Sequence, residues 1–479
     1  YSKELEGIHD HFIPFLNICK ENHTAIRIGV NHGSLSDRIM SRYGDTAEGM
    51  VESCMEFLRI CKEEDFTDVV ISIKASNTVV MVRTVRLLVA VMGEEGMDFP
   101  LHLGVTEAGE GEDGRIKSAL GIGALLADGL GDTIRVSLSE EPEAEIPVAR
   151  KLMDYVLWRR NHLYIPGLEA EGFNYLSPSR RRTRAVRNIG RENLPVVIAF
   201  GQEREPETDP RFIPDYVYAG RALPNVLEAG TEYILDADVW EGQESTWPAF
   251  NHGRLFAVNS YPSALKFFFI SYPALTDEVI SCLKVHPEMV VISQSNHLNR
   301  LGEHRALVHQ LMREGLQNPV VFFQHYAENN AEDLQIKAAA DMGGVIFDGF
   351  CDGIFLYNQG ELSSNATDAI AFGILQAGCV RTSKTEYISC PGCGRTLFDL
   401  QKTIVRVKAA TSHLKGVKIA IMGCIVNGPS EMADADYGYV GAGRGRISLY
   451  KRRECIEKNI PEENAVEKLM ELITGIALP

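Results

Sequence analysis

The chain has 479 residues, of which 45% are hydrophobic and 24% charged, and its formal net charge is −17 at pH 7. This length accommodates two or three domains of ordinary globular composition. The negative charge argues against a general nucleic-acid binder, and no apolar run reaches the roughly 18 residues of a membrane span. The ten cysteines are mostly single within apolar segments, so they predict a reducing compartment and not a secreted disulfide framework.

The first 160 residues predict four consecutive βα units. We expect strands at 26–31, 68–76, 101–107 and 132–139, and helices at 46–63, 78–92, 116–127 and 144–158. Apolar strands that alternate with amphipathic helices are typical of a parallel sheet.

Polar side chains gather at the ends of these strands. Side chains an even number of positions apart point to the same side of a strand. Three pairs of polar residues have this spacing: Arg27 with Asn31, Lys74 with Ser76, and Arg135 with Ser137. Polar groups at the carboxyl ends of parallel strands favour the active-site end of a (β/α)8 TIM barrel over an open doubly wound sheet. Four strands are half of such a barrel. We therefore expect the N-terminal half-barrel to be missing, with Tyr1 not the natural start.

From 161 to 245 the pattern weakens, and we expect a connector with one isolated strand at 194–200. Its basic run, 180–184 with Arg187 and Arg191, has no interleaved aromatic residues, which favours a solvated segment over an RNA-binding one. From 254 to 379 the βα pattern returns. Strands are predicted at 255–259, 267–271, 289–293, 320–324 and 344–348, with helices at 303–314 and 331–342.

This central region, 161–381, is interpreted as a connector and a second, barrel-like α/β insert domain. Its strand-end polar residues form no coherent catalytic set, so we expect a structural spacer; they are Gln294, Asn296, Gln324 and His325. Residues 382–479 predict a small α+β domain with a strand at 417–422 and a terminal helix at 461–476.

The last domain carries the most specific motifs, Cys390-Pro-Gly-Cys393 and Met422-Gly-Cys-Ile-Val-Asn-Gly-Pro-Ser-Glu431. Three thiolates can hold a soft metal centre, but a 4Fe–4S cluster or a structural zinc normally takes four ligands. The turn at 427–429 can fold Glu431 back towards the metal. A carboxylate is a hard and displaceable ligand on a soft centre, which indicates a catalytic site.

Two alternatives stay open for the CxxC motif. A redox disulfide between Cys390 and Cys393 is one. The other is a non-catalytic α/β protein with a structural zinc, although a zinc ribbon would need a second CxxC or a His-Cys pair that this domain lacks.

CPGCGR together with MGCIVNGPxE resembles the cluster domain of the 4-hydroxy-3-methylbut-2-enyl diphosphate synthases, iron–sulfur enzymes of the non-mevalonate isoprenoid pathway. The segments IRIGVNHGSL, ISIKAS, HLGVTEAG and GDTIRVSLS resemble that family's barrel strands. The resemblance covers the first 160 and the last 100 residues. The central region is similar to the extra domain of the family's large three-domain form.

The resemblance implies that a 4Fe–4S cluster is ligated by Cys390, Cys393, Cys424 and Glu431. It implies that 2-C-methyl-D-erythritol 2,4-cyclodiphosphate is opened and reductively dehydroxylated to 4-hydroxy-3-methylbut-2-enyl diphosphate with two electrons. The family's diphosphate-binding basic residues match Arg27, Lys74 and Arg135, and its neighbouring polar contacts match Asn31, Ser76 and Ser137. Glu107 matches its acid–base carboxylate. Guanidinium and ammonium groups suit phosphate oxygens, and a carboxylic acid can protonate a leaving hydroxyl.

Three features of this chain affect how the roles of the family's residues apply to it. The family has glycine where this chain has Ser430; if that position needs positive φ, serine costs on the order of 1 kcal/mol and shifts Glu431. His102 has the opposite strand parity to Glu107, so both face one site only if Gly104 allows a bulge. The missing half-barrel predicts that this fragment alone is inactive and that its open sheet edges favour aggregation.

Electrons have to come from a partner, because no dinucleotide fingerprint follows a predicted strand. The resemblance implies ferredoxin or flavodoxin, both acidic, which requires a local basic patch on this acidic chain. We expect that patch at Arg444, Arg446, Lys451, Arg452 and Arg453. No nucleic-acid or membrane partner is expected. The chain could form a homodimer or cap its own barrel, in bacterial cytoplasm or, for a plant protein, in the chloroplast stroma.

Overall fold

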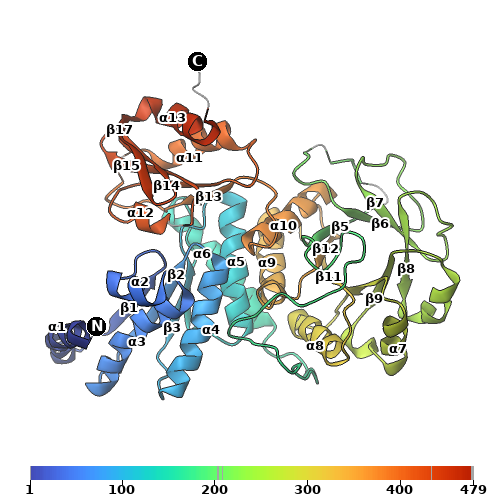
Figure 1. Ribbon diagram of the computed structural model, residues 1–479, viewed down its shortest axis with the longest axis horizontal. Helices are drawn as coiled ribbons and strands as arrows, with labels where there is room; N and C mark the ends of the chain where they lie inside the picture. Colours follow the sequence, from blue (N-terminus) through green and yellow to red (C-terminus); the bar gives the residue numbers. More distant parts are fainter. Residues whose placement is uncertain (1, 202–203, 208, 397, 433, 476–479) are drawn as a thin grey trace. The chain divides into compact units, whose positions relative to one another are not determined.

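The computed structural model describes residues 2–201, 204–207, 209–396, 398–432 and 434–475. The chain divides into two compact units (Figure 1). The first unit comprises Tyr1–Arg150 and Lys384–Pro479, and the second comprises Lys151–Ser383. Among the described residues, no helix combines the length and the apolar character that crossing a bilayer requires.

The N-terminal part of the first unit is built on a parallel sheet with the strand order β1-β2-β3-β4. The strands are β1 (Ile26–Asn31), β2 (Val69–Ala75), β3 (Leu101–Val105) and β4 (Thr133–Arg135). The helices are α1 (Ser2–Glu21), α2 (Asp37–Tyr43), α3 (Ala47–Glu63), α4 (Thr78–Glu94), α5 (Gly111–Ala127), the short η1 (Pro142–Ala144) and the start of α6 (Glu145–Trp158), whose residues from Lys151 on belong to the second unit. The four predicted βα units are confirmed, whereas α1 and α2 had not been predicted.

The two faces of this sheet differ, as the alternation of side chains predicts. One face is apolar and packs on α3, α4 and α5, which lie side by side (Figure 1); Ile28, Ile71 and Leu103 are among its buried residues. Residues in register on parallel strands share a face. Asn31, Lys74, Gly104 and Arg135 are in register across the four strands, so they form one row on the opposite, polar face.

Strand β4 is shorter than expected. It pairs with β3 only up to Arg135, and residues 136–139, which were predicted to continue the strand, do not pair with β3. The backbone N–H of Ser139 donates instead to the carbonyl of Gly109 at 3.0 Å. The chain beyond β4 therefore follows the loop after β3 and not the strand itself.

The C-terminal part of the first unit is a five-stranded mixed sheet. Strands β13 (Glu386–Ser389), β14 (Lys418–Met422) and β15 (Tyr437–Gly443) are parallel, and β16 (Arg446–Lys451) and β17 (Glu454–Pro461) continue the sheet antiparallel. Helices α11 (Leu400–Thr411) and α13 (Glu462–Thr474) pack on it through a buried core that includes Ile404, Val407 and Leu469. The short α12 (Gly428–Glu431) follows β14. The predicted strand and terminal helix are confirmed, with residue 476 of that helix outside the described residues.

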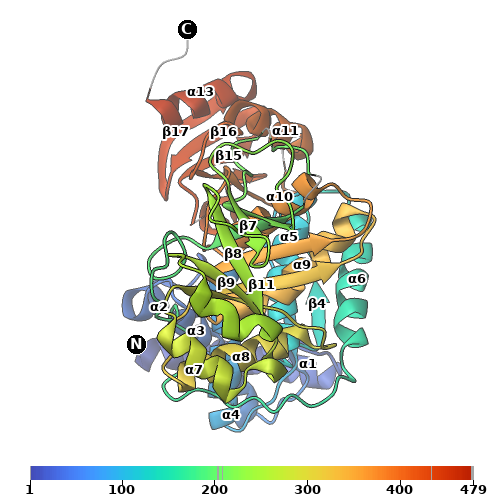
Figure 2. The ribbon, with the colours of Figure 1, turned by 90° about the vertical axis from the view of Figure 1, so that its right-hand side faces the viewer.

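The second unit is a closed eight-stranded parallel barrel in which β12 pairs with β5, and Figure 2 shows its strands β7, β8, β9 and β11. Its strands are β5 (Val196–Phe200), β6 (Tyr216–Gly220), β7 (Glu232–Asp236), β8 (Thr246–Asn251), β9 (Lys266–Ile270), β10 (Met289–Ser293), β11 (Val320–Tyr326) and β12 (Gly353–Asn358). The helices are η2 (His252–Ser260), η3 (Tyr272–Ala274), α7 (Asp277–Val285), α8 (Arg300–Arg313), α9 (Ala331–Phe347) and α10 (Ser364–Ala377).

The barrel corrects several expectations for the central region. Residues 161–245 are not a connector with one isolated strand, because they contribute β5, β6 and β7 to the barrel. The strands predicted at 255–259 and 344–348 are wrong, since these residues lie in η2 and at the end of α9. Short apolar runs fit a strand and a buried helix equally well, which is why periodicity failed there.

The basic run of the central region is not simply a solvated segment. Arg181 is buried, and its guanidinium donates to the carbonyls of Asn318 at 3.0 Å and Leu316 at 2.7 Å. Arg187 pairs with Glu232 and lies over the ring of Trp247. These arginines tie the segment before β5 to the barrel, which agrees with the argument against RNA binding.

Candidate functional site

A cavity of about 270 Å³ lies in the first unit between the strand ends of the parallel sheet and the cysteine motifs. The sheet side contributes Asn31, Lys74, Thr106, Glu107 and Arg135. The motif side contributes Cys390, Pro391, Gly392, Cys393, Arg395, Thr396, Met422, Gly423, Cys424, Asn427, Gly428 and Glu431. Segments more than 250 residues apart in the sequence thus line one space.

The sheet side of the cavity is cationic. Burial lowers the pKa of Lys74, and the charges of Arg135 and Arg27 act in the same direction. Lys74 and Arg135 flank Gly104 in the polar row, where a Cβ would lie 3.3 Å from the carbonyl oxygen of Arg135. A side chain at Gly104 would therefore crowd the backbone of Arg135.

Three predicted residues are not among the described residues that line the cavity. Arg27 is exposed on the same polar face, four residues before Asn31. Ser76 is half-buried just after β2, and Ser137 is buried with its hydroxyl 3.5 Å from the Arg135 guanidinium. They surround the cationic row without bordering the cavity.

Glu107 is buried and has an unusual backbone conformation. Its φ of 50° lies in the left-handed region, which costs a non-glycine residue on the order of 1 kcal/mol or more. Burial and, second to it, the charge of Glu431 raise the pKa of Glu107 to about 7, against the opposing effects of the Thr106 hydrogen bond and the charges of Arg135 and Lys74. Because β3 ends at Val105, strand parity does not decide where Glu107 points.

His102 lies on the same face as the cationic row, two residues before Gly104. Its Nδ1 is 2.7 Å from the hydroxyl of Thr133. Burial lowers the pKa of His102, and the nearby charges of Arg27, Arg135 and Lys74 act with it. The turn after β3, and not a bulge at Gly104, is what lets Glu107 reach the cavity.

The thiols come from loops at one edge of the mixed sheet. Cys390 follows β13 and Cys424 follows the neighbouring parallel strand β14. The sulfur of Cys390 accepts the N–H of Gly423 at 3.2 Å, and the sulfur of Cys393 accepts the N–H of Arg395 at 3.4 Å. The Arg395 N–H lowers the pKa of Cys393, whereas burial raises that of Cys390.

Glu431 enters the cavity from the helical turn α12. Its backbone N–H donates to the carbonyl of Asn427 at 2.9 Å, and the Asn427 side chain donates to its carboxylate at 3.4 Å. Burial raises the pKa of Glu431. Ser430 lies in this turn and is not among the described residues with positive φ, so the strain considered for serine at this position is not found.

The donor set fits a sulfur-ligated centre. Three thiols and one carboxylate line one cavity, and two of the sulfurs accept backbone N–H groups, which stabilise thiolates and tune the potential of iron–sulfur centres. Within the described ranges, no three His, Cys, Asp or Glu side chains are grouped as a site for a single metal ion.

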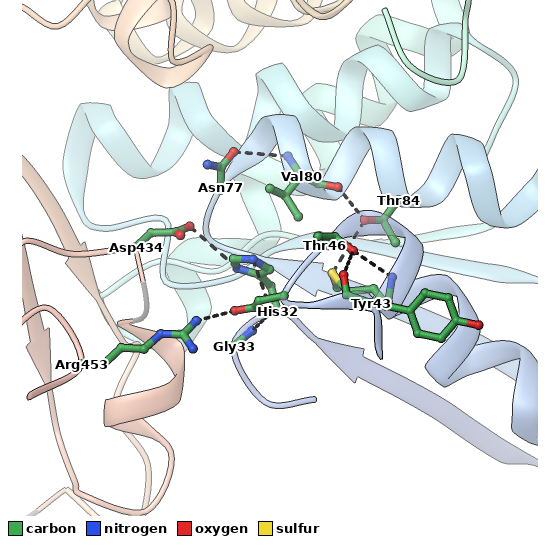
Figure 3. A network of polar contacts seen from close by, with 12 residues as sticks. His32, Gly33, Tyr43, Thr46, Asn77, Val80, Thr84, Asp434 and Arg453 are labelled. Atoms are coloured by element: carbon green, nitrogen blue, oxygen red, sulfur yellow. Dashed lines mark hydrogen bonds and ion pairs between the residues drawn. The ribbon is translucent and has the colours of Figure 1, made fainter. Parts of the chain in front are cut away.

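A polar network joins the end of β1 to the cysteine-bearing part of the unit (Figure 3). Nε2 of His32 lies 3.5 Å from the carboxylate of Asp45, and its Nδ1 lies 3.8 Å from that of Asp434. Asp45 also accepts the N–H of Gly33 at 3.0 Å and the guanidinium of Arg453 at 2.6 Å. This network holds the loop after Asn31 against the C-terminal part.

The ion pair between Arg453 and Asp45 involves one of the five residues of the expected basic patch. Arg453 is paired with Asp45, and Arg446 donates to the carbonyl of Asn459 at 3.2 Å. Arg444 and Arg446 lie at the β15–β16 hairpin, whereas Lys451, Arg452 and Arg453 lie at the β16–β17 hairpin. Since β16 has six residues, the two groups lie roughly 17 Å apart at its two ends, and a single basic patch stays a prediction.

Sequence reasoning gave no role to three polar lining residues: Thr106, Arg395 and Thr396. The Thr396 hydroxyl accepts the N–H of Cys393 at 3.0 Å, and the Arg395 side chain interacts with that thiol. Their position within three residues of Cys393 is the signal that could have identified both.

A parallel α/β sheet whose polar strand ends line one cavity together with cysteine loops is an arrangement typical of α/β enzymes, in which the carboxyl ends of parallel strands form the active site. Two family models match the first unit: the GcpE TIM-barrel domain at residues 6–150 and the GcpE protein C-terminal domain at residues 386–475.

Curated relatives match almost the whole chain. A 4-hydroxy-3-methylbut-2-en-1-yl diphosphate synthase (flavodoxin) of Bacteroides thetaiotaomicron is 78% identical over 473 residues, 99% of this chain and 77% of the relative. Its counterpart of Porphyromonas gingivalis is 48% identical over 98% of this chain and 75% of the relative. The chloroplastic ferredoxin form of Oryza sativa is 40% identical over 99% of this chain and 70% of the relative. The chain belongs to the 4-hydroxy-3-methylbut-2-en-1-yl diphosphate synthase family, as its motifs predict, and is an oxidoreductase.

Proposed function

We propose that this chain carries out the reductive ring opening and dehydroxylation of 2-C-methyl-D-erythritol 2,4-cyclodiphosphate. Two electrons enter, the ring C–O bond to phosphate breaks, a hydroxyl leaves as water, and 4-hydroxy-3-methylbut-2-enyl diphosphate is released. The observation that carries the proposal is one cavity lined by Lys74, Arg135 and Glu107 on one side and by the three cysteines on the other.

In this proposal the cationic row binds the diphosphate. Lys74 and Arg135 contact phosphate oxygens, the Asn31 amide donates to them, and Arg27 adds positive charge from its exposed position on the same face. Ser76 and Ser137 supply hydroxyl groups at the margin. A guanidinium fork and an ammonium group are well suited to phosphate oxygens, and burial strengthens both contacts.

Glu107 serves as the acid–base group. It is buried at the cavity wall between the cationic row and the cysteine loops. From there its carboxylic acid can give a proton to the leaving hydroxyl, and its held backbone conformation keeps the acid in place without a reorganisation step.

The residues that would hold a 4Fe–4S cluster are Cys390, Cys393, Cys424 and Glu431. When bound, such a cluster supplies single electrons to the substrate and a weakly held iron position. The N–H groups of Gly423 and Arg395 orient the Cys390 and Cys393 sulfurs. The structural-zinc alternative is not favoured, because it leaves the cationic row and Glu107 without a role.

Flavodoxin or ferredoxin is the proposed electron donor, because the names of the relatives give one or the other. The strands β1–β4 are proposed to form half of a TIM barrel, and the functional division is proposed as 1–160, 161–381 and 382–479. The chain would work in bacterial cytoplasm, or in the chloroplast stroma of a plant. A homodimer and a self-capping chain remain alternative assemblies.

Calorimetric titration with the cyclodiphosphate tests the proposal. Arg135→Met should weaken binding at least tenfold, about 1.4 kcal/mol, because it removes one of the two lining cations. Arg444→Met, at the β15–β16 hairpin outside the cavity, is the matched control and should bind as the wild type does. Equal affinities of both variants and the wild type would remove the basis of the proposed substrate site.

A further inference from the structure

We propose that the closed barrel of the second unit is itself a binding site, for a small phosphate or diphosphate ester with an apolar body. This site is separate from the proposed reaction and does not depend on it. A cavity of about 510 Å³ lies towards the carboxyl ends of the barrel strands, lined by residues from the middle and the end of these strands and from the segments that follow them. That end of a (β/α)8 barrel is where its ligands bind, and the volume is typical of small-molecule sites.

The floor of this cavity is a layer of aromatic rings. Ile198, Phe267 and Val321 belong to the buried interior core, and each is followed two residues later by a ring on the same side of its strand. These rings are Phe200, Phe269 and Phe323, with Tyr218 of β6 beside them. The rings of Tyr218 and Phe269 lie 5.2 Å apart, and all four are only partly buried.

A purely structural barrel would fill this layer with buried side chains, because interiors pack close to crystal density. Here the core is closed by Ile198, Ile234 and Phe267 one layer below, and the upper rings face open space. Exposed rings around a cavity contribute favourable contacts only when an apolar group covers them. The floor therefore fits a hydrocarbon body.

The rim of the cavity carries two arginines and two aspartates in an organised arrangement. The guanidinium groups of Arg221 and Arg254 both contact Oδ2 of Asp238, at 2.7 and 3.0 Å. Each guanidinium has five N–H groups, so the shared carboxylate orients the two arginines and engages few of their donors. The nearby Asp236 accepts the hydroxyl of Tyr218 at 2.7 Å, which directs that carboxylate to the wall. Two arginines held at one point match phosphate oxygens.

The aromatic floor and the two rim arginines together define the class of ligand. A free phosphate would leave the aromatic floor in water, and a plain hydrocarbon would leave the two arginines without an anion. A phosphate ester with an apolar body satisfies both parts of the cavity. The four polar strand-end residues predicted for this region point to the same end of the barrel, although only Gln294 lines the cavity among its described residues.

Three probes separate the two parts: geranyl diphosphate has the body and the anion, pyrophosphate only the anion, and geraniol only the body. All three tryptophans of the chain, Trp158, Trp240 and Trp247, belong to the second unit, so tryptophan fluorescence reports binding there. Geranyl diphosphate should bind at least tenfold more tightly than either partial probe. Equal affinity for geranyl diphosphate and pyrophosphate would contradict the role of the aromatic floor.

Variants of the whole chain separate this site from the proposed active site, which also takes diphosphates. The double variant Arg221→Ala/Arg254→Ala should weaken geranyl diphosphate binding at least tenfold, whereas Arg135→Met and the exposed control Arg313→Ala should leave it unchanged. Loss in Arg135→Met with retention in the double variant would assign the binding to the first unit and overturn the inference, as would no binding by the wild type. Failure of the cyclodiphosphate titration alone would leave this result standing.

Discussion

Ser139, just after β4, and Ser389, the last residue of β13, share a buried contact in which their hydroxyl oxygens are 2.7 Å apart. The Ser139 hydroxyl also lies 3.0 Å from the carbonyl oxygen of Ser389, to which it donates. Beside it, Ala108 and Ser389 form an isolated parallel bridge. Because Ala108 follows Glu107 and Ser389 precedes Cys390, this contact sets the carboxyl group next to the first thiol.

Ser139→Ala should loosen this contact. The variant leaves the Ser389 hydroxyl buried with one partner fewer, which costs about 1–3 kcal/mol of local opening free energy. Hydrogen–deuterium exchange of residues 386–390 should accelerate roughly 5- to 150-fold. The exposed Ser41→Ala is the control and should change nothing there. Unchanged exchange in Ser139→Ala would mean that other contacts hold the two parts together.

Gly423→Ala should disturb the cysteine loops. A Cβ at this position would lie 2.6 Å from the Thr396 hydroxyl oxygen, and that hydroxyl accepts the N–H of Cys393. Displacing Thr396 should lower the iron content of the reconstituted protein well below that of the wild type. Gly394→Ala is a close control, since a Cβ there meets nothing within 4 Å. Equal iron contents in the two variants would contradict this geometry.

His304 should make a pH-dependent contribution to the stability of the second unit, opposed by that of Asp368, whose pKa burial raises to about 7. This side chain is buried, with Nδ1 2.7 Å from the Ser293 hydroxyl and Nε2 3.0 Å from the Gln324 amide nitrogen. Burial lowers the pKa of His304 to about 3. In the unfolded chain the His304 imidazole takes up a proton near pH 6.5, whereas in the folded protein it stays neutral at that pH. The stability contributed by neutral His304 is therefore present above pH 6.5 and lost as pH falls towards 3.

Between pH 7.5 and 5.5 this effect amounts to about 1.4 kcal/mol in the free energy of unfolding. Denaturant unfolding followed by tryptophan fluorescence measures it, because the tryptophans are confined to this unit. The pH dependence of His304→Gln should differ from that of the wild type by this amount, whatever its stability at pH 7.5, and that of the exposed His413→Gln should not. The same slope in His304→Gln and the wild type would rule out His304 as the source.

The cationic row was predictable because it depends only on strand alternation. Asn31, Lys74 and Arg135 lie in register as their parity indicates. Glu107 was placed by family resemblance alone, since its left-handed conformation ends the alternation after β3. The pairing of Arg453 with Asp45 joins residues more than 400 positions apart, which no local pattern contains.

The barrel of the second unit was only half predicted, for a physical reason. Strands β9 to β11 are followed by helices and give the expected βα pattern, whereas among the described residues no α-helix lies between β5 and β8. Without helices, strands of five or six residues separated by polar turns resemble an irregular connector. The closure of β12 on β5 then depends on long-range pairing that the sequence pattern does not display.

The central claim is that Cys390, Cys393, Cys424 and Glu431 hold an iron–sulfur cluster at the cavity. Anaerobic iron and sulfide analysis with an EPR spectrum of the reduced protein tests it most directly, on wild type, Cys424→Ala and Cys455→Ala. Cys455 lies on β17 and does not line the cavity within the described residues, so it is the matched control. We predict about four irons and four sulfides per chain in the wild type and Cys455→Ala, and loss of both in Cys424→Ala. Zinc in the wild type, or an unchanged cluster in Cys424→Ala, would contradict the account.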